Sequence, residues 1–212
     1  MLRMYGFAGI LLIILVEINF FLKIQPFANW YFPIVWLGYI LTLDALVFKL
    51  KGNSLISNRF YQFLGIIVIS MLFWWIFEFT NIPLKNWKYL GLEDIGVWKN
   101  FFGSISFATV LPALFETVEL VRAIHLFDKI KLHKKHKITK VFLHSMILLG
   151  VIFFMAPLAL PTFAFPLIWL SFFFILDPIN YLHKQPSIVG YWKNGNIKIP
   201  LMLFVAGTLC GL

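Results

Sequence analysis

The chain of 212 residues is 61% hydrophobic and only 13% charged, whereas soluble globular domains average about 45–50% apolar and about 25% charged residues. This composition excludes an ordinary soluble domain, so the formal net charge of +9 has to be explained for a membrane protein. The single cysteine, Cys210, excludes an intrachain disulfide bond and a cysteine-based zinc site.

Seven apolar segments follow one another along the chain. In lipid a helix satisfies its own backbone hydrogen bonds, and about 17–25 apolar residues cross a hydrocarbon core of about 30 Å. The predicted spans are residues 5–22, 30–48, 60–79, 101–121, 141–160, 162–176 and a segment that begins near residue 199. The first span lacks a small-residue cleavage site, so we interpret it as a retained helix. The sequence therefore predicts an all-α, polytopic transmembrane bundle.

Lysine and arginine predict the orientation of this bundle. With the N-terminus in the cytoplasm, the inner loops hold 14 of the 18 basic residues, seven of them in the loop 122–140. Basic residues concentrate in cytoplasmic loops, so we expect this orientation in a prokaryotic cytoplasmic membrane. Anionic lipid headgroups facing the loop 122–140 would explain the net charge without nucleic acid as a partner.

An internal repeat organises the chain. The segment Phe-Pro-Ile-Val-Trp-Leu at 32–37 returns as Phe-Pro-Leu-Ile-Trp-Leu at 165–170, and the same offset of 133 relates Asp44 to Asp177 and 54–56 to 187–189. We predict a four-helix unit over 1–133 and a second, truncated unit over 134–212, with seven of about eight spans present. An even number of helices per unit makes the repeat parallel. Because residue 212 falls inside a span, we expect roughly fifty further residues in the natural chain.

Acidic residues inside predicted spans are functional candidates, because a charge in the hydrocarbon core is costly. Glu116 and Glu119 are spaced i, i+3 and share one helix face, and Pro112 one turn earlier predicts a kink beside them. We expect this pair to act as proton donor and acceptor in acid–base catalysis. Asp44 and Asp177, at a similar depth, are candidate substrate-binding groups.

These inner carboxyl groups also have a purely structural interpretation. Glu119 can pair with Arg122 three residues later, and Asp44 and Asp177 can simply end their helices, as the dipeptide Asp177-Pro178 suggests.

A second layer of polar residues lies at the predicted outer boundary. Glu78 is a third candidate catalytic acid, and Asn81, Trp75 and Trp87 are candidate substrate-binding residues. Tryptophan at this depth is also typical of the aromatic belt that anchors helices at headgroup level. The histidines of the basic loop fit a headgroup-binding face better than a metal site, and we expect neither a metal nor a cofactor.

The motifs at 74–81 (Trp-x-x-x-Glu-Phe-x-Asn), 86–89 (Asn-Trp-x-Tyr) and 176–187 resemble those of an uncharacterised prokaryotic family of polytopic membrane proteins. This resemblance covers most of the chain and implies no activity.

A more distant likeness is to the membrane lycopene cyclases, which place an acid beside a tryptophan, then an aromatic turn, then a proline and two glutamates. Trp75 with Glu78, the turn 87–89 and the segment 112–119 follow that order over about a third of the chain. The glutamate pair is split here, and the repeat has four helices instead of three. The likeness implies carboxyl groups that protonate a polyene substrate entering from the bilayer.

The first functional hypothesis is therefore a membrane-embedded enzyme that acts on a lipid or isoprenoid through Glu116, Glu119 and Glu78. A transporter with Asp44 and Asp177 along its path is one alternative, and a non-catalytic membrane scaffold is another. The sequence leaves open whether the protein is an enzyme.

Overall fold

The computed structural model describes residues 2–89, 98–130 and 134–211, and in these residues it is helical and contains no strand. Two of the helices are short, α3 and α8. In chain order the helices are α1 (Met4–Leu22), α2 (Tyr31–Lys51), α3 (Leu55–Asn58), α4 (Phe60–Leu84), α5 (Trp98–Ala123), α6 (Lys140–Ala159), α7 (Pro161–Leu182), α8 (Ile188–Lys193) and α9 (Lys198–Gly211). The prediction of an all-α fold is confirmed.

Six helices, α1, α2, α4, α5, α6 and α7, are long and apolar enough to cross a membrane. They coincide with the first six predicted spans, which supports a multi-pass membrane protein. The seventh predicted span corresponds to α9, which has 14 residues and is shorter than the other six.

The sixth predicted span ends too early. Asp177-Pro178 was expected to terminate a helix, but α7 continues through both residues to Leu182. A proline removes one backbone hydrogen bond, and membrane helices tolerate this loss where neighbouring groups satisfy the freed carbonyl. The interpretation of Asp44 as a helix terminus is also wrong, because α2 runs on for seven residues to Lys51.

The helices form two compact units, and neither unit is one continuous stretch of chain. The first comprises Met1–Glu78, Tyr89–Leu126 and Phe204–Leu212, and the second comprises Phe79–Lys88 and Phe127–Leu203. Helices α4 and α9 therefore contribute to both units.

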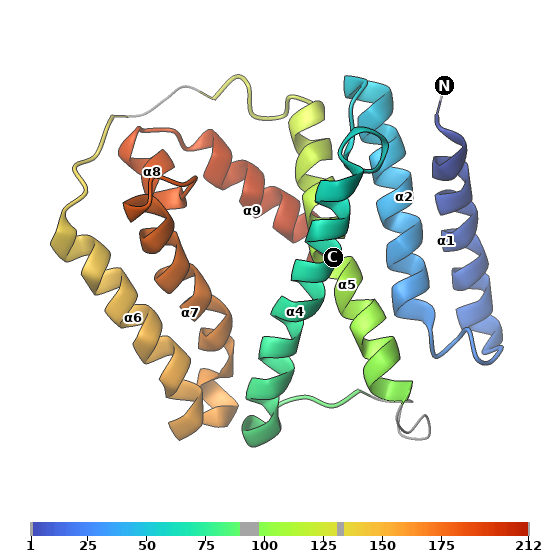
Figure 1. The fold of residues 1–212 in the computed structure, drawn as a ribbon, viewed down its shortest axis with the longest axis horizontal. Coiled ribbons are helices and arrows are strands. Elements are labelled where there is room, and N and C mark those ends of the chain that lie inside the picture. The colour runs from blue at the N-terminus through green and yellow to red at the C-terminus, as the bar shows by residue number, and fades with distance from the viewer. Residues whose placement is uncertain (1, 90–97, 131–133, 212) are drawn as a thin grey trace. The chain divides into compact units, whose positions relative to one another are not determined.

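In the first unit α1 and α2 form an antiparallel pair, and α2 also packs along α5 (Figure 1). The first contact is close because it uses glycine: a Cβ atom on Gly9 would lie 2.6 Å from the backbone oxygen of Gly38. Small residues allow such backbone approach between membrane helices. The centre of this unit is a cluster of Ile40, Leu55, Phe63 and Ala113.

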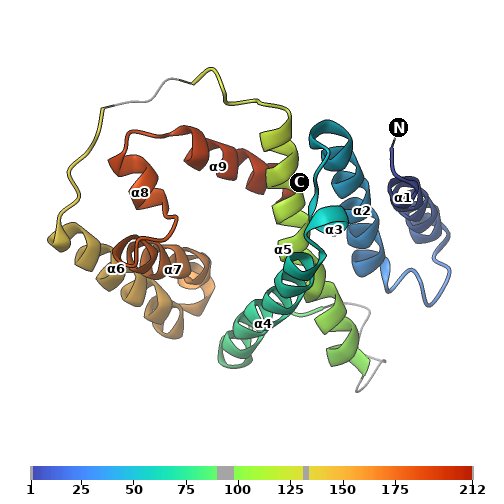
Figure 2. The ribbon, with the colours of Figure 1, turned by 45° about the horizontal axis from the view of Figure 1, so that its top comes forward.

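In the second unit α6 and α7 form a helical hairpin, and they lie side by side in both views (Figures 1 and 2). Only Leu160 separates the two helices. A Cβ atom on Gly150 would lie 3.0 Å from the backbone oxygen of Ser171, so this pair also meets at small residues. Leu143, Met146 and Val189 form the core that joins the hairpin to α8.

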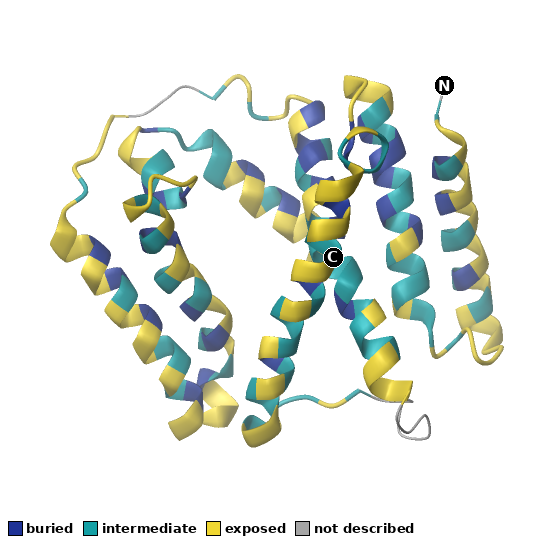
Figure 3. Cartoon of the chain, viewed as in Figure 1, coloured by how far each residue is buried: buried dark blue, intermediate teal, exposed yellow. Residues whose placement is uncertain are grey.

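Large apolar side chains cover much of the helix surface. Along α1, for example, Leu11, Leu15 and Phe21 are exposed, and Figure 3 shows exposed residues at intervals along α1, α4 and α6. Water would disfavour such a surface, whereas a hydrocarbon environment accommodates it. The exposed surface and the helix lengths together fit an integral membrane protein.

Candidate functional site

Asp44 is the hydrogen-bonding centre of the first unit. It lies in the last two turns of α2, is fully buried, and accepts hydrogen bonds from the Tyr5 hydroxyl at 2.5 Å, the Ser54 hydroxyl at 2.8 Å and the Ile56 backbone N–H at 2.8 Å. The Tyr5 hydroxyl also hydrogen bonds with the Ser57 hydroxyl at 2.9 Å. Three donors on one carboxylate compensate for much of the hydration that burial removes.

The chain around Asp44 explains this arrangement. The segment that follows α2 turns back at Gly52, whose φ of 72° suits a residue without a side chain. Ser54 then caps α3 by accepting from the Ser57 backbone N–H at 3.4 Å, and Asp44 accepts from Ile56 within the same first turn. A free N–H at a helix start is an ordinary partner for an acidic group.

Glu119 is an ion-pair centre. Its carboxylate contacts the Lys51 ammonium group, lies 3.6 Å from the Arg59 guanidinium group, and lies 3.3 Å from the Arg122 guanidinium group. The predicted structural pairing with Arg122 is therefore confirmed. The ends of α2 and α3 bring two further basic side chains, Lys51 and Arg59, to the same carboxylate.

Glu116 differs from both of these acids. Its side chain is fully buried, and neither carboxyl oxygen has a hydrogen-bond partner among the residues that the structure describes. The charged groups near enough to act on it electrostatically are Asp44, Glu119 and Arg59. An isolated buried carboxylate is among the most costly groups that a protein interior can hold.

A side chain of α4 contacts the backbone of α5 in the turns before Glu116, beside Pro112. The Ser70 hydroxyl of α4 donates to the Phe107 carbonyl at 2.5 Å and accepts from the Leu111 N–H at 3.0 Å. These two backbone groups are four residues apart, the spacing of a helical hydrogen bond, and lie directly before Pro112. Insertion of a side chain into the helix ladder and a proline are both recognised causes of a bend.

The structure thus brings together three of the four predicted inner acids, Asp44, Glu116 and Glu119. Asp177 belongs to the second unit, where it accepts from the backbone N–H groups of Ile188 at 2.6 Å and Val189 at 2.9 Å. Sequence reasoning missed Tyr5, Ser54 and Lys51 as partners of the site. Only Ser54 carried a signal, since it begins one of the repeated blocks.

The predicted outer residues make separate contacts. Glu78 accepts a hydrogen bond from the Tyr89 hydroxyl at 2.5 Å, and the Trp75 indole N–H donates to the Ser104 hydroxyl at 3.1 Å. A similar pair joins α1 to the start of α2, where Glu17 accepts from the Tyr31 hydroxyl at 2.5 Å.

Asn81 and Trp87 lie together in the second unit. The Asn81 amide oxygen accepts from the backbone N–H of Asn86 at 2.8 Å, and its amide nitrogen donates to the Trp87 carbonyl at 2.9 Å. The Trp87 ring lies 5.1 Å from the Phe165 ring, measured between centroids. Asn81 therefore holds the turn after α4, and Trp87 fastens that turn to the start of α7.

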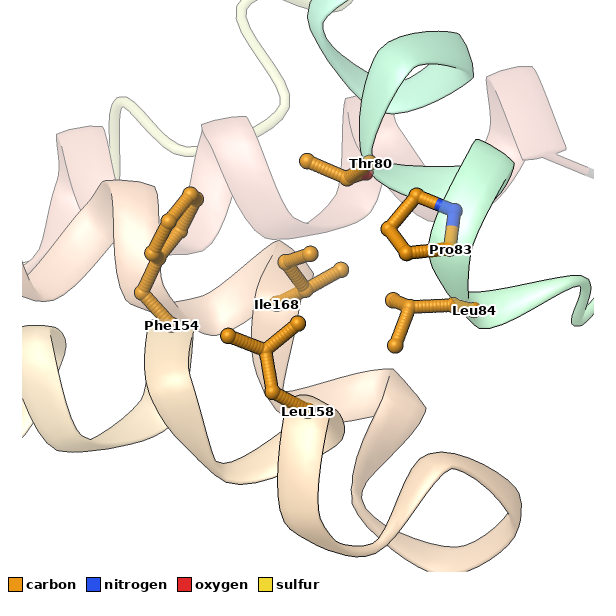
Figure 4. Close-up of a pocket in the computed structure, with 6 residues that line it drawn as sticks. All are labelled: Thr80, Pro83, Leu84, Phe154, Leu158 and Ile168. Atoms are coloured by element: carbon orange, nitrogen blue, oxygen red, sulfur yellow. The ribbon is translucent and has the colours of Figure 1, made fainter.

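A small cavity of about 90 Å³ lies in the second unit between the end of α4 and the α6–α7 hairpin (Figure 4). Its wall is apolar except for one threonine hydroxyl, and it contains none of the predicted site residues. The lining residues are Thr80, Pro83, Leu84, Phe154, Leu158 and Ile168.

In the described part of the chain, no three His, Cys, Asp or Glu side chains are grouped so that they could hold a metal ion. No family model, no curated protein and no solved structure matches the chain. The chemistry of the site therefore has to be inferred from its own geometry.

Proposed function

We propose that this integral membrane protein performs acid–base chemistry on a lipid or isoprenoid substrate, with Glu116 as the proton donor and Asp44 as its partner base. The observation that carries this proposal is the burial of Glu116 without a hydrogen-bond partner beside an aspartate that has three. Two neighbouring carboxyl groups in contrasting surroundings are the usual basis for assigning an acid and a base.

The different surroundings of the two carboxyl groups decide which is the acid and which is the base in this proposal. Asp44 has donors that stabilise a negative charge, whereas Glu116 has none and is least costly to bury as the neutral acid. A neutral carboxylic acid in a dry environment can give its proton to an apolar substrate, and the adjacent carboxylate can take a proton back. This proposal replaces the predicted pair Glu116 and Glu119 with the pair Glu116 and Asp44.

Glu119 has a different role in this proposal. Its three cations, Lys51, Arg59 and Arg122, hold it as a carboxylate, so it is a positioning residue that fixes α5 against the ends of α2 and α3. Glu78, bonded to Tyr89, is a second acid in the proposal.

The proposed class of substrate follows from the surface through which a substrate would reach the protein. Exposed apolar side chains on the long helices fit contact with lipid, so a lipid-soluble substrate reaches the protein from the bilayer. The distant likeness to the lycopene cyclases is consistent with a polyene in this role. Trp75, which belongs to the same unit as Glu116, is proposed to contribute a contact to such a substrate, whereas Trp87, Asn81 and Asp177 belong to the second unit and keep the structural contacts described above.

A proton-coupled transporter is the second candidate, and one observation favours it. Glu116 interacts with Glu119, and Glu119 is joined to Lys51 and Arg122, whose side chains are 30% and 54% exposed. These groups form a polar route from a fully buried acid to the protein surface, as a proton path requires.

We also propose that the chain is an internal duplication with a cytoplasmic N-terminus. The matched hydrogen bonds of Asp44 and Asp177 to backbone N–H groups 133 residues apart, those of Ile56 and Val189, support the duplication. The distribution of lysine and arginine supports the orientation.

Infrared difference spectroscopy on the full chain in lipid nanodiscs tests the central step. We expect the carbonyl band of a protonated carboxylic acid in the wild type and in Glu17→Gln, and its loss in Glu116→Gln. Glu17 is the matched control because it is a second glutamate in a span and has a tyrosine partner. A spectrum without such a band, or a band that survives in Glu116→Gln, contradicts the proposal.

The activity itself is tested by mass spectrometry of lipid extracts from cells that produce each variant. A lipid or isoprenoid product is expected with the wild type and with Glu17→Gln, and it should disappear with Glu116→Gln. Identical lipid profiles for all three proteins, combined with proton flux in vesicles that depends on Glu116, would favour the transporter.

A further inference from the structure

A layer of chain that belongs to neither long helix lies at the open end of the α6–α7 hairpin. Leu160 closes one end of the hairpin, so Lys140 at the start of α6 and Leu182 at the end of α7 lie at the other. The segment 134–139 and the short helix α8 cover this end. A hydrogen bond joins the segment to α8: the backbone N–H of His136 donates to the Lys193 carbonyl at 3.0 Å.

This layer is strongly basic. Its exposed lysines are Lys134, Lys135, Lys137, Lys140, Lys184 and Lys193. Among the described residues, none of these lysines forms an ion pair with an acid. The carboxylate of Asp177 does not neutralise them either, since it is directed to the first backbone N–H groups of α8. The residues 131–133 of the same basic loop lie outside the described part of the chain.

A column of rings leads from the basic layer to the apolar helix surface. The His136 ring is stacked on the Trp192 ring with centroids 4.8 Å apart, and the Trp192 ring lies 5.7 Å from the Phe142 ring of α6. Trp192 is 41% exposed, and Val141, which precedes Phe142 in the chain, is 74% exposed. A tryptophan between a charged and an apolar surface is typical of the membrane interface.

We propose that this end of the hairpin binds the headgroup of an anionic phospholipid. The phosphate would lie among the lysines, and the acyl chains would follow the exposed apolar surface of α6 below Trp192. Both halves of the ligand are needed to explain the surface, because a free phosphate or a nucleic acid would use the lysines and leave the apolar side unoccupied. This site is separate from the proposed acid–base site, which lies in the other unit.

Lipid titration followed by native mass spectrometry of the full chain tests this inference. We expect phosphatidylglycerol to bind more tightly than phosphatidylcholine. The triple variant Lys134→Gln, Lys135→Gln, Lys137→Gln should weaken the binding of phosphatidylglycerol at least about tenfold, since each basic side chain near an anionic surface contributes a factor of about five. Phosphatidylcholine binding should not change.

The matched control removes the same amount of charge elsewhere. Lys23, Lys85 and Lys88 are also exposed, and the variant with all three changed to glutamine should keep the affinity of the wild type. A second control replaces Trp192 with alanine, which should weaken binding of the intact lipid and leave any binding of soluble glycerol phosphate unaltered.

Three results would overturn the inference. Equal affinity for the two phospholipids would show that charge does not select the ligand. An equal loss in the two triple variants would show that only net charge matters. Binding of soluble glycerol phosphate or of an oligonucleotide as tight as that of phosphatidylglycerol would show an anion site that does not need the bilayer.

Discussion

The surroundings of Asp44 and of Asp177 show how one local motif is used in two ways. Each aspartate lies near the end of a long helix and accepts from backbone N–H groups of a short helix that follows it, α3 or α8. In each case a serine, Ser54 or Ser187, caps that short helix. We call each such set a bracket: Asp44, Ser54 and α3 form the first, and Asp177, Ser187 and α8 form the second. Each bracket fixes the chain that links two long helices.

The difference lies in what else reaches the carboxylate. Asp44 receives the hydroxyl groups of Tyr5 and Ser54 as well and interacts with Glu116, whereas the hydrogen bonds that the structure gives Asp177 come from two backbone N–H groups. The bracket is therefore structural in both units. The first bracket is in addition part of a candidate site, because two hydroxyl groups and the carboxyl group of Glu116 act on its aspartate.

The helix pairs that precede the brackets also differ. Gly38 and Ser171, which contact the partner helix, are 133 residues apart, but their contacts Gly9 and Gly150 are 141 apart. The connection between the two helices is residues 23–30 in the first pair and Leu160 alone in the second. The first helix of the second pair is therefore displaced along its partner by roughly 12 Å, at a rise of about 1.5 Å per residue. In this register Met146, which packs against Val189, takes the place of Tyr5, and it has no hydroxyl group to offer Asp177.

The largest expected effect is on activity. Asp44→Asn should lower the rate of product formation by about 10²–10⁴-fold, because it removes the base, while Asp177→Asn should leave the rate within about threefold. The rate is measured on the lipid product in membranes adjusted to equal protein content. Equal losses in the two variants would mean that both aspartates act only through the fold.

Stability is the second comparison. Asp44→Ala should lower the free energy of unfolding by about 3 kcal/mol, because the fully buried Ser54 hydroxyl and the Ile56 N–H lose their partner. Asp177→Ala should lower it by about 1–2 kcal/mol, since its carboxylate has fewer donors. Denaturant titration in detergent micelles measures both. A larger loss for Asp177→Ala would reverse the ranking of the two brackets.

The ion-pair centre gives a third prediction. Glu119→Gln should destabilise the first unit by about 1–3 kcal/mol, because Lys51, Arg59 and Arg122 then repel one another without a counter-charge. Adding Arg59→Gln to this variant should restore part of the loss. The same titration checks this, and a double variant that is less stable than Glu119→Gln alone would count against the role given to Glu119.

The sequence predicted the long helices and one part of the site well. Six of the seven predicted spans correspond to helices long enough to cross a membrane, because length and apolar content alone identify such a helix. Glu116 and Glu119 were correctly placed close together, because i, i+3 spacing puts two residues on one helix face whatever surrounds them.

The other contacts depend on tertiary packing. Asp44 reaches Glu116, and Lys51 reaches Glu119, only because α2 packs along α5. Arg59 reaches Glu119 only because the chain turns back at Gly52 after α2. The helices α3 and α8 are too short to show a periodic pattern. Asp177-Pro178 misled the prediction because its terminating signal is weak within a membrane helix.

The smallest expected effect separates the two serine caps from each other. Ser187→Ala should cost about 1 kcal/mol, the usual contribution of an N-cap, because the Gly190 N–H loses its acceptor. Ser54→Ala should cost about 2 kcal/mol, because the Ser54 hydroxyl caps α3 and also donates to Asp44. Unfolding titrations of both variants, with Ser145→Ala at an exposed serine of α6 as the control, measure the difference. If the two losses are equal, the hydrogen bond from Ser54 to Asp44 adds nothing to the cap, and the carboxylate of the first bracket is held no more tightly than that of the second.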